Sequence, residues 1–392
     1  MSKNSSLLQH GFSNVILTGL LGLGLSYLLA VALVMIPIVQ TYITYAHRVD
    51  FFGYNKFDHP EDYGLAPGKT VNMKLQSSDN TTIGAWFIVA DSIHRERALV
   101  PPTPNQQLAS IPSSLSKRPT ILFLHGNTGT RALPVRVTVY TGLTARLDAN
   151  LFTIDYRGFG DSAGRPTVDG VARDARTAWN YLISQGANPR DVLVVGHSLG
   201  AAIAGLLAAD LARDGIEPRG LVLMSAFSSV RKLIDHYCLF GFLPLLKPLS
   251  IVPFAPRVVT WSLKHRFDTL ALVPILKASV LLVHGENDWD IPHTHSSTLF
   301  EAFLEPFLPT PALTPSGNPS SGKHVSQSDF SAKQRSAIVT SASINGFGTL
   351  EEFVDHRKGG RRVAMLKTMA GGHDVGRLEG VQDAIGRMFD FN

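Results

Sequence analysis

Hydrophobic and polar positions follow a regular order along the chain from about residue 70 onward. Segments 70–75 and 83–90 alternate apolar and polar residues, as strands do, around a polar turn. From residue 120, short apolar runs typical of buried strands alternate with longer segments typical of helices. This alternation indicates right-handed βαβ units, and therefore an α/β fold with a mainly parallel central sheet and helices on both faces. The expected strands are 121–125, 151–156, 192–196, 221–225, 279–285 and 361–367, and the expected helices are 135–147, 171–184 and 201–213.

A long apolar run lies near the amino terminus, where residues 15–39 include no charged side chain. A membrane-spanning helix needs about 20 mainly apolar residues, whereas the apolar region of a cleaved signal peptide has about 7–15. We therefore expect a single transmembrane helix over 15–39, after an amino-terminal tail over 1–14 and before a connector over 40–69. The few flanking charges are too evenly divided to set its orientation.

Two segments of the expected catalytic domain, 70–392, break the alternation. The first, 228–268, is apolar and rich in proline, and it lies where a lid is commonly inserted in such folds. Because proline prevents one long helix, we expect short helices with an apolar face over the site, with ordinary core packing as the alternative. The second, 306–345, is rich in Ser, Pro and Thr, and predicts a disordered insertion.

Composition narrows the class of protein. A chain of 392 residues with 44% hydrophobic and 17% charged residues can bury a sizeable core, and we expect one catalytic domain with appendages. The single cysteine, Cys238, excludes an internal disulfide framework and argues against a zinc cluster. A net charge of +5 suits an anionic membrane surface. The basic residues are scattered rather than clustered with aromatic ones, which argues against nucleic acid as a partner.

The motif Gly-His-Ser-Leu-Gly at 196–200 stands between an expected strand and a helix of small residues. This context is typical of a nucleophile elbow, a tight turn that lifts a serine hydroxyl clear of the sheet edge. We therefore assign Ser198 as the candidate nucleophile. A second Gly-x-Ser-x-Gly match surrounds Ser162, but Pro166 follows it closely and restricts the preceding residue to extended geometry, so no helix can begin on this serine.

A serine nucleophile needs a base to take its proton and a third group to orient that base. The loop after strand 279–285 carries Asp288 and Asp290, and a carboxylate there shares the sheet edge with the elbow. Asp288 is the preferred acid and Asp290 its substitute. His373 follows the last expected strand in a glycine-rich loop, and is the candidate base.

The oxyanion that forms during acyl transfer needs two backbone N–H donors. One is expected from Leu199, the residue after the nucleophile. The other is expected from Asn127, in the polar, glycine-bearing loop that follows strand 121–125.

The segments 125–131, 155–162 and 196–200 resemble the α/β-hydrolase superfamily. Together with the amino-terminal apolar run, they look more narrowly like its membrane-bound branch, which includes the lysophosphatidylserine and monoacylglycerol lipases. The resemblance extends from about residue 63 to the carboxyl terminus, apart from the insertion before His373. It implies an α/β-hydrolase fold and a catalytic domain in the lumen of the endoplasmic reticulum.

These observations predict a membrane-anchored serine hydrolase that cleaves lipid esters, with a monoacylglycerol or a lysophospholipid as substrate. The expected mechanism requires neither a metal nor an organic cofactor. One alternative is a protein acyl-thioesterase or serine peptidase of the same fold, and another is a membrane-anchored binding protein with a degenerate site. The sequence sets neither the head group, nor the acyl length, nor the oligomeric state.

Overall fold

The computed structural model describes residues 3–49, 55–96, 100–236, 238–239, 243–244, 255–308 and 327–391. A ten-stranded sheet forms its centre. The strands pair in parallel from β4 through β3, β5, β6 and β9 to β12, and the remaining pairs at the two edges are antiparallel. The predicted α/β fold with a mainly parallel sheet is confirmed. In spatial order the strands are β1 (Thr70–Gln76), β2 (Thr82–Ile88), β4 (Asn150–Ile154), β3 (Thr120–Leu124), β5 (Val192–His197), β6 (Gly220–Met224), β9 (Val280–Gly285), β12 (Arg361–Thr368), β11 (Gly348–Asp355) and β10 (Thr340–Ile344).

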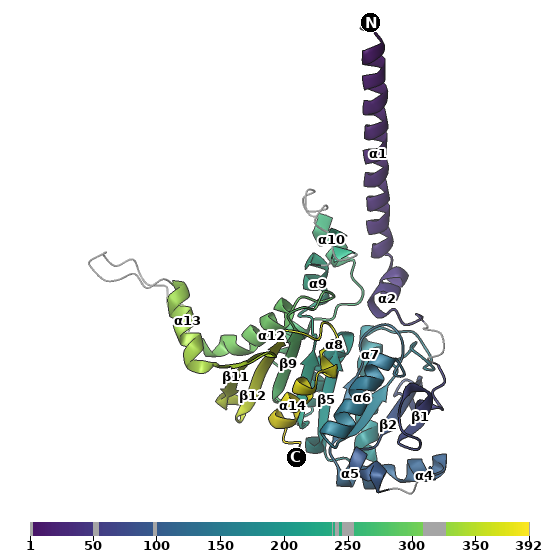
Figure 1. The fold of residues 1–392 in the computed structure, drawn as a ribbon, viewed down its shortest axis with the longest axis vertical. Coiled ribbons are helices and arrows are strands. Elements are labelled where there is room, and N and C mark those ends of the chain that lie inside the picture. Colours follow the sequence, from purple (N-terminus) through teal and green to yellow (C-terminus); the bar gives the residue numbers. More distant parts are fainter. Residues whose placement is uncertain are drawn as a thin grey trace, which may run out of the picture.

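Helices cover both faces of this sheet (Figure 1). One core cluster includes residues of α7, α8 and α12, and a second cluster on the other face includes residues of α6 and α14. Strands β3, β4, β6 and β9 are buried along their whole length, which explains why they read as continuous apolar runs rather than as alternating patterns. The helices are α6 (Pro134–Arg146), α7 (Val168–Ser184), α8 (Leu199–Arg213), α12 (Thr294–Leu304) and α14 (Glu379–Met388).

The amino-terminal apolar run forms two helices rather than one. Helix α1 (Lys3–Met35) projects from the α/β body, and α2 (Pro37–Tyr45) lies at its base (Figure 1). The chain turns at Ile36, whose backbone is extended because Pro37 disfavours a helical conformation in the preceding residue. The predicted helix over 15–39 is therefore wrong at its carboxyl end. Residues Leu17–Met35 are long and apolar enough to cross a membrane, with a mean hydropathy of 2.1, although a signal sequence passes the same test.

Two segments expected to lack regular structure contain short elements. Residues 101–118, whose prolines and serines are typical of a loop, form α4 (Pro104–Ala109) and α5 (Ile111–Lys117). The insertion predicted to be disordered carries α13 (Gln327–Ile338) and the edge strand β10, so the prediction does not hold for 327–345. Every side chain of β10 is exposed, and the strand is held by backbone pairing to β11, so no apolar alternation marks it in the sequence. Residues 309–326 lie outside the described part.

The predicted lid segment, 228–268, contains α9 (Val230–His236) and α10 (Ala255–Trp261). Between these helices, β7 (Cys238–Leu239) pairs antiparallel with β8 (Leu243–Pro244). Short helices are therefore present as predicted. Most of the apolar run 239–254 lies outside the described residues.

Candidate active site

Ser198 occupies the tight turn between β5 and α8. Its backbone has φ 54° and ψ −119°, a conformation that a residue with a side chain rarely adopts. The flanking glycines are required by close packing, because a Cβ on Gly196 would collide with the carbonyl of Gly200, and one on Gly200 with the carbonyl of Leu124. Backbone strain of this kind persists only where the surrounding structure enforces it, and it gathers at functional sites. The turn has the geometry expected of a nucleophile elbow.

Ser162, in the second Gly-x-Ser-x-Gly match, is held in place by the backbone around it. Its hydroxyl donates to the carbonyl of Asp155 at 2.7 Å and accepts from the N–H of Gly84 at 2.9 Å. No helix begins at this serine, and α7 starts only at Val168. Ser162 therefore ties the β4 loop to β2, and its hydroxyl already has two partners.

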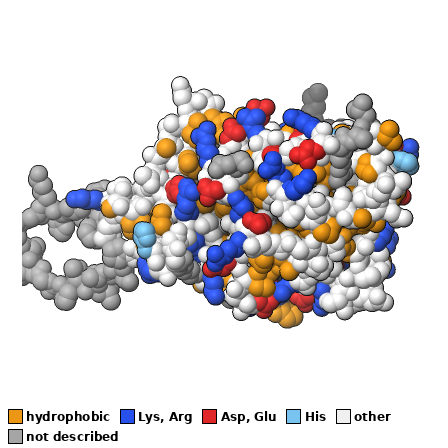
Figure 2. All heavy atoms as spheres, turned by 90° about the horizontal axis from the view of Figure 1, so that it is seen from below, with side chains coloured by type: hydrophobic (Ala, Val, Ile, Leu, Met, Phe, Trp, Pro, Cys, Tyr) orange, Lys and Arg blue, Asp and Glu red, His pale blue; other side chains and the backbone are white. Residues whose placement is uncertain are grey.

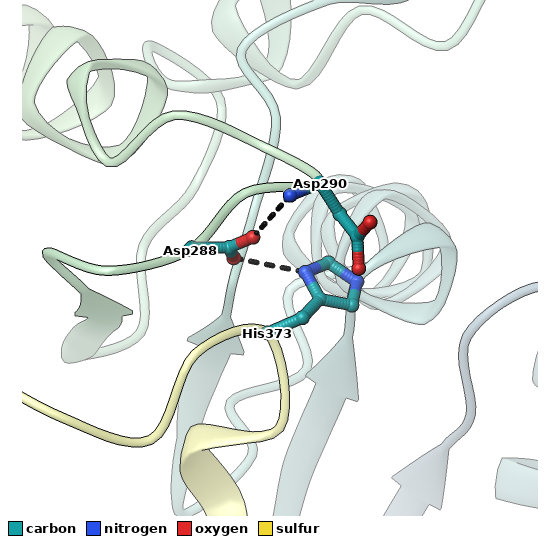
Figure 3. A group of neighbouring side chains, drawn as sticks. All are labelled: Asp288, Asp290 and His373. Carbon is teal, nitrogen blue, oxygen red and sulfur yellow. Dashed lines mark hydrogen bonds and ion pairs between the residues drawn. The ribbon is translucent and has the colours of Figure 1, made fainter. Parts of the chain in front are cut away.

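Asp288 and His373 are brought together by the ends of β9 and β12, which are neighbouring parallel strands. The Nδ1 atom of His373 lies 2.8 Å from Oδ2 of Asp288 (Figure 3). The other carboxylate oxygen of Asp288 accepts from the N–H groups of Asp290 at 2.9 Å and Ile291 at 3.0 Å. Burial opposes the charge of Asp288, but hydrogen bonds from His284 and His373 outweigh it and hold the pKa of this carboxyl well below its usual range. The ionised carboxylate thus fixes the orientation of the His373 ring through Nδ1.

Asp290 takes a different position. It is exposed, and Figure 3 shows its carboxylate beside the end of the imidazole ring away from Asp288. Burial tends to lower the pKa of His373, but Asp288, with smaller contributions from Asp290 and Asp374, raises it above its ordinary value. Asp288 rather than Asp290 makes the hydrogen bond to Nδ1.

The main chain of His373 is also anchored. Nε2 of His197 and Oγ of Ser225 both donate to its carbonyl oxygen, each at 2.8 Å. Burial, reinforced by the nearby His373, lowers the pKa of His197 to about 3, so this ring is neutral near pH 7 and keeps a single N–H for the bond. No pattern in the sequence predicts this role for the two residues, although His197 lies inside the serine motif.

The loop after β3 passes beside the elbow and is held by a buried arginine of α6. A Cβ on Gly126 would lie 3.2 Å from Cβ of Ser198. Arg136 donates to the carbonyls of Gly126 at 3.0 Å, Asn127 at 2.8 Å, Thr128 at 2.6 Å and Thr130 at 2.7 Å. In a trans peptide the C=O and N–H point in opposite directions, so the N–H of Asn127 points away from Arg136. Asn127 was predicted from the sequence, whereas no sequence pattern marks Arg136, which orients this loop.

A cavity of about 180 Å³ joins these parts of the site. Asn127, Ser198 and His373 all line it. Its walls also include apolar side chains of α6 and the end of β6, among them Val139 and Met224. The candidate nucleophile, the candidate base and the loop after β3 that carries Asn127 (the oxyanion loop) therefore face one small cavity at the carboxyl edge of the sheet.

Replacing Arg136 is expected to impair catalysis through the loop rather than through contact with substrate. Arg136→Met removes a donor that four carbonyls share, two of which keep another partner. Losing one oxyanion donor lowers kcat by about 10²–10³-fold. We expect kcat to fall by about 10²-fold with little change in KM, and Arg136→Lys to restore part of it. Arg176→Met, which removes the ion pairs of α7 with Asp210 and Asp214, is the control. A folded Arg136→Met protein with unchanged kcat would refute the role.

Residues of the motifs at 125–131 and 155–162 form a buried polar network beneath the site. The guanidinium of Arg131 contacts the carboxylates of Asp155 and Asp161, and Nε2 of His125 lies 3.1 Å from Asp155. Although burial opposes its charge, the Arg131 guanidinium beside Asp155 holds the pKa of that carboxyl below its usual range. These residues therefore support the oxyanion loop and do not line the cavity.

Asp288, Asp290 and His373 are also the group among the described residues whose oxygen and nitrogen atoms could hold a metal ion, because one ligand atom from each lies within 4.8 Å of the others. A cation there would occupy the Asp288 oxygen or the His373 nitrogen that the acid–base pair uses. The expected chemistry of the site needs the pair free.

Comparison with known proteins gives a consistent family. The profile of the Alpha/beta hydrolase family matches residues 121–358, more than half of the chain. The lysophosphatidylserine lipase ABHD12 of Danio rerio is 28% identical over 71% of this chain and 70% of its own length. That of Macaca fascicularis is 32% identical over 69% of this chain and 65% of its own. An alpha-beta hydrolase from Vibrio vulnificus has the same fold, with a TM-score of 0.53, 16% identity and coverage of 90% and 92% of the two chains.

Proposed function

Because the chain belongs to the alpha/beta hydrolase family, we propose that it is a membrane-anchored serine hydrolase of lipid esters. The observation that carries this proposal is the 2.8 Å hydrogen bond between Asp288 and His373, on a cavity that Ser198 also lines from a strained turn. A nucleophile at an elbow, and a base directed by a buried carboxylate, are the two requirements of acyl transfer through serine.

The proposed reaction has two steps. Oγ of Ser198 attacks the ester carbonyl while His373 accepts its proton, and the oxyanion is stabilised by the N–H groups of Leu199 and Asn127. His373 then donates the proton to the departing alcohol, which leaves an acyl group on Ser198. A water molecule, deprotonated by His373, attacks this acyl-enzyme and releases a fatty acid. Asp288 keeps the imidazole oriented and stabilises its positive charge in both steps. The proposal needs no metal and no organic cofactor.

The proposed substrate is a monoacylglycerol or a lysophospholipid. Two features support this class: relatives are named lysophosphatidylserine lipases, and the amino-terminal helix α1 is long and apolar enough to lie in a membrane. The chain spans between 56% and 70% of the length of the relatives of that name that it matches. An acyl-thioesterase, a peptidase and a binding protein with a degenerate site are the alternatives that the test must separate.

A fluorophosphonate probe and a substrate panel test this proposal on the full chain in detergent. All substrates carry the same acyl chain: a monoacylglycerol, two lysophospholipids with different head groups, a thioester-linked peptide and an acyl amide. We expect labelling, together with hydrolysis of the glycerol or phospholipid esters above the uncatalysed rate. A larger rate enhancement on the thioester or the amide would replace the lipase assignment, and failure of labelling would favour the binding protein.

Membrane topology gives a separate prediction. We expect the protein to resist extraction by carbonate as a single-pass protein of the endoplasmic reticulum, with the catalytic domain in the lumen. Asn80 begins the sequence Asn-Thr-Thr in the exposed turn between β1 and β2, so a luminal domain can carry a glycan there. Protease added to intact microsomes should spare the catalytic domain unless detergent is present. Digestion without detergent would exclude the luminal placement and leave the serine hydrolase proposal unchanged.

A further inference from the structure

The lid segment packs against the apolar helix α1 as well as against the catalytic body. Val31 of α1 and Val259 of α10 are only 7% and 4% exposed, and together form a small apolar cluster. Tyr27 and Met35 of α1 and Ile234 of α9 pack against this cluster. Figure 1 shows α9 and α10 on the side of the body from which α1 projects. The lid and the apolar helix therefore meet directly.

The depth of this contact follows from the length of α1. At 1.5 Å per residue, the 19 residues Leu17–Met35 extend over about 28 Å, close to the ~30 Å of bilayer hydrocarbon. Val31 lies four residues before the end of that span, which places it about 6 Å inside the hydrocarbon. Val259 touches the same cluster and must lie at a similar depth. This step rests on the proposed membrane anchorage of α1.

The rest of α10 has the surface that such a position requires. Val258 is 51% exposed and Trp261 is 78% exposed, although both are large apolar side chains. Tryptophan is enriched where hydrocarbon meets the lipid head groups. A cavity of about 630 Å³ opens beside these two residues and is also lined by Arg231 and Arg266. The exposed surface therefore has an apolar part, formed by Val258 and Trp261, next to a cavity.

Basic side chains lie on the same segments as the apolar Val258 and Trp261. Arg231, Lys232, Lys264 and Arg266 are all exposed, whereas the nearby Asp268 caps α11 (Thr269–Leu272) through the N–H of Ala271. Juxtamembrane basic residues are attracted to acidic lipids, by about 1 kcal/mol each near the surface. The opposite end of the molecule differs, because acidic and basic side chains are interspersed there (Figure 2). The charge on the lid side is thus complementary to an anionic bilayer.

Helix α2 fixes the lid segment in this orientation. The side chain of Gln40 donates to the carbonyl of Ser262 at 3.1 Å and accepts from the N–H of Lys264 at 2.7 Å. Thr41 and Tyr45 hydrogen-bond the two ring nitrogens of the buried His265, at 2.8 and 3.3 Å. The segment after α10 therefore stays beside the base of α1.

We propose that the exposed face of the lid, formed by Val258 and Trp261 with Arg231, Lys264 and Arg266 around them, binds the surface of a bilayer that contains acidic phospholipids. It forms a second membrane contact next to α1. The same bilayer that holds the anchor then lies against the lid, and a lipid substrate reaches the catalytic body without crossing water.

Quenching of tryptophan fluorescence by brominated lipids tests this contact on the full chain in phosphatidylcholine–phosphatidylserine vesicles. The chain has four tryptophans, of which Trp86 and Trp179 are buried and Trp289 is exposed on the loop after β9. With bromine on the acyl carbons nearest the head group, Trp261→Phe should lose at least half of the quenching. Trp289→Phe, which also removes one exposed indole, should lose less. Undiminished quenching in Trp261→Phe would overturn the proposal.

A second experiment tests whether the basic side chains contribute to binding of acidic lipids. Arg231→Gln with Lys264→Gln should reduce the extra quenching that phosphatidylserine vesicles give over pure phosphatidylcholine by at least twofold. The matched control, Lys117→Gln with Arg190→Gln, alters basic residues that precede β3 and β5 and so lie at the opposite edge of the sheet from Ser198. An equal effect in both pairs would refute a specific basic surface.

Carbonate extraction of the same vesicles distinguishes a failure of the lid contact from a failure of the membrane anchorage of α1. Protein that resists carbonate while Trp261 stays unquenched would refute the lid contact alone. Protein that carbonate releases, with Trp261 unquenched, would refute both the anchor and the lid contact.

Discussion

Ser198→Ala should abolish ester hydrolysis and fluorophosphonate labelling, with a loss of about 10⁶-fold in kcat. Ser198 lies in the strained turn between two close-packed glycines, and it is the hydroxyl-bearing side chain among the residues that line the cavity. The rate of product release from the preferred lipid ester, measured together with gel-based labelling, checks this expectation.

Ser162→Ala is the matched control because it alters the serine of the second Gly-x-Ser-x-Gly motif. It removes the hydrogen bonds to Asp155 and Gly84, and should lower the free energy of unfolding by about 1–3 kcal/mol while most activity remains. Labelling that survives Ser198→Ala but disappears with Ser162→Ala would reverse the assignment of the nucleophile.

Substitution of the candidate acid or base should reduce activity far more than substitution of the neighbouring Asp290. His373→Ala is expected to be nearly as damaging as Ser198→Ala, because residues of a triad act as a unit. Asp288→Asn removes the charge that faces Nδ1, a change that costs about 10⁴-fold in a serine protease triad. Asp290→Asn leaves that hydrogen bond in place and should cost less than about tenfold. The opposite ranking of the two aspartates, in kcat/KM, would mean that Asp290 is the acid.

The pH profile of kcat/KM distinguishes the two aspartates further. A histidine acts as a base only when neutral, so activity that depends on His373 should rise as the pH passes its pKa. The negative charge of Asp290 contributes to raising that pKa, and Asp290→Asn therefore should move the rising limb to lower pH. A limb that moves to higher pH, or does not move, would contradict an electrostatic role for Asp290.

The sequence predicted the sheet and the candidate triad for a common physical reason. Strands of a parallel sheet end at one edge, so residues placed just after the strand ends converge even when they are distant in sequence. Ser198, Asp288 and His373 follow β5, β9 and β12, so each stands in the loop behind an apolar run. For Ser198 the Gly-x-Ser-x-Gly motif was needed as well, because the alternation of strands and helices alone does not identify a nucleophile.

The residues that position the loops of the site have no recognisable pattern in the sequence. Arg136 binds backbone carbonyls, and His197 and Ser225 bind the carbonyl of His373, so their partners carry no recognisable side chain. A buried arginine inside a helix looks like any surface arginine until the loop that it holds is placed beside it. Strand β10 escaped notice for a related reason, because backbone pairing alone holds it.

Helix α2 has a practical consequence for any attempt to produce the protein without its apolar helix α1. Tyr45 is fully buried, packs against Phe159 and Phe267, and accepts at its carbonyl the N–H of Thr128 in the oxyanion loop, at 2.9 Å. A shortened chain that begins after Tyr45 leaves that N–H unpaired and opens a hollow under the lid. A shortened chain that begins at Ile36 keeps these contacts, and is the appropriate starting point for a water-soluble form.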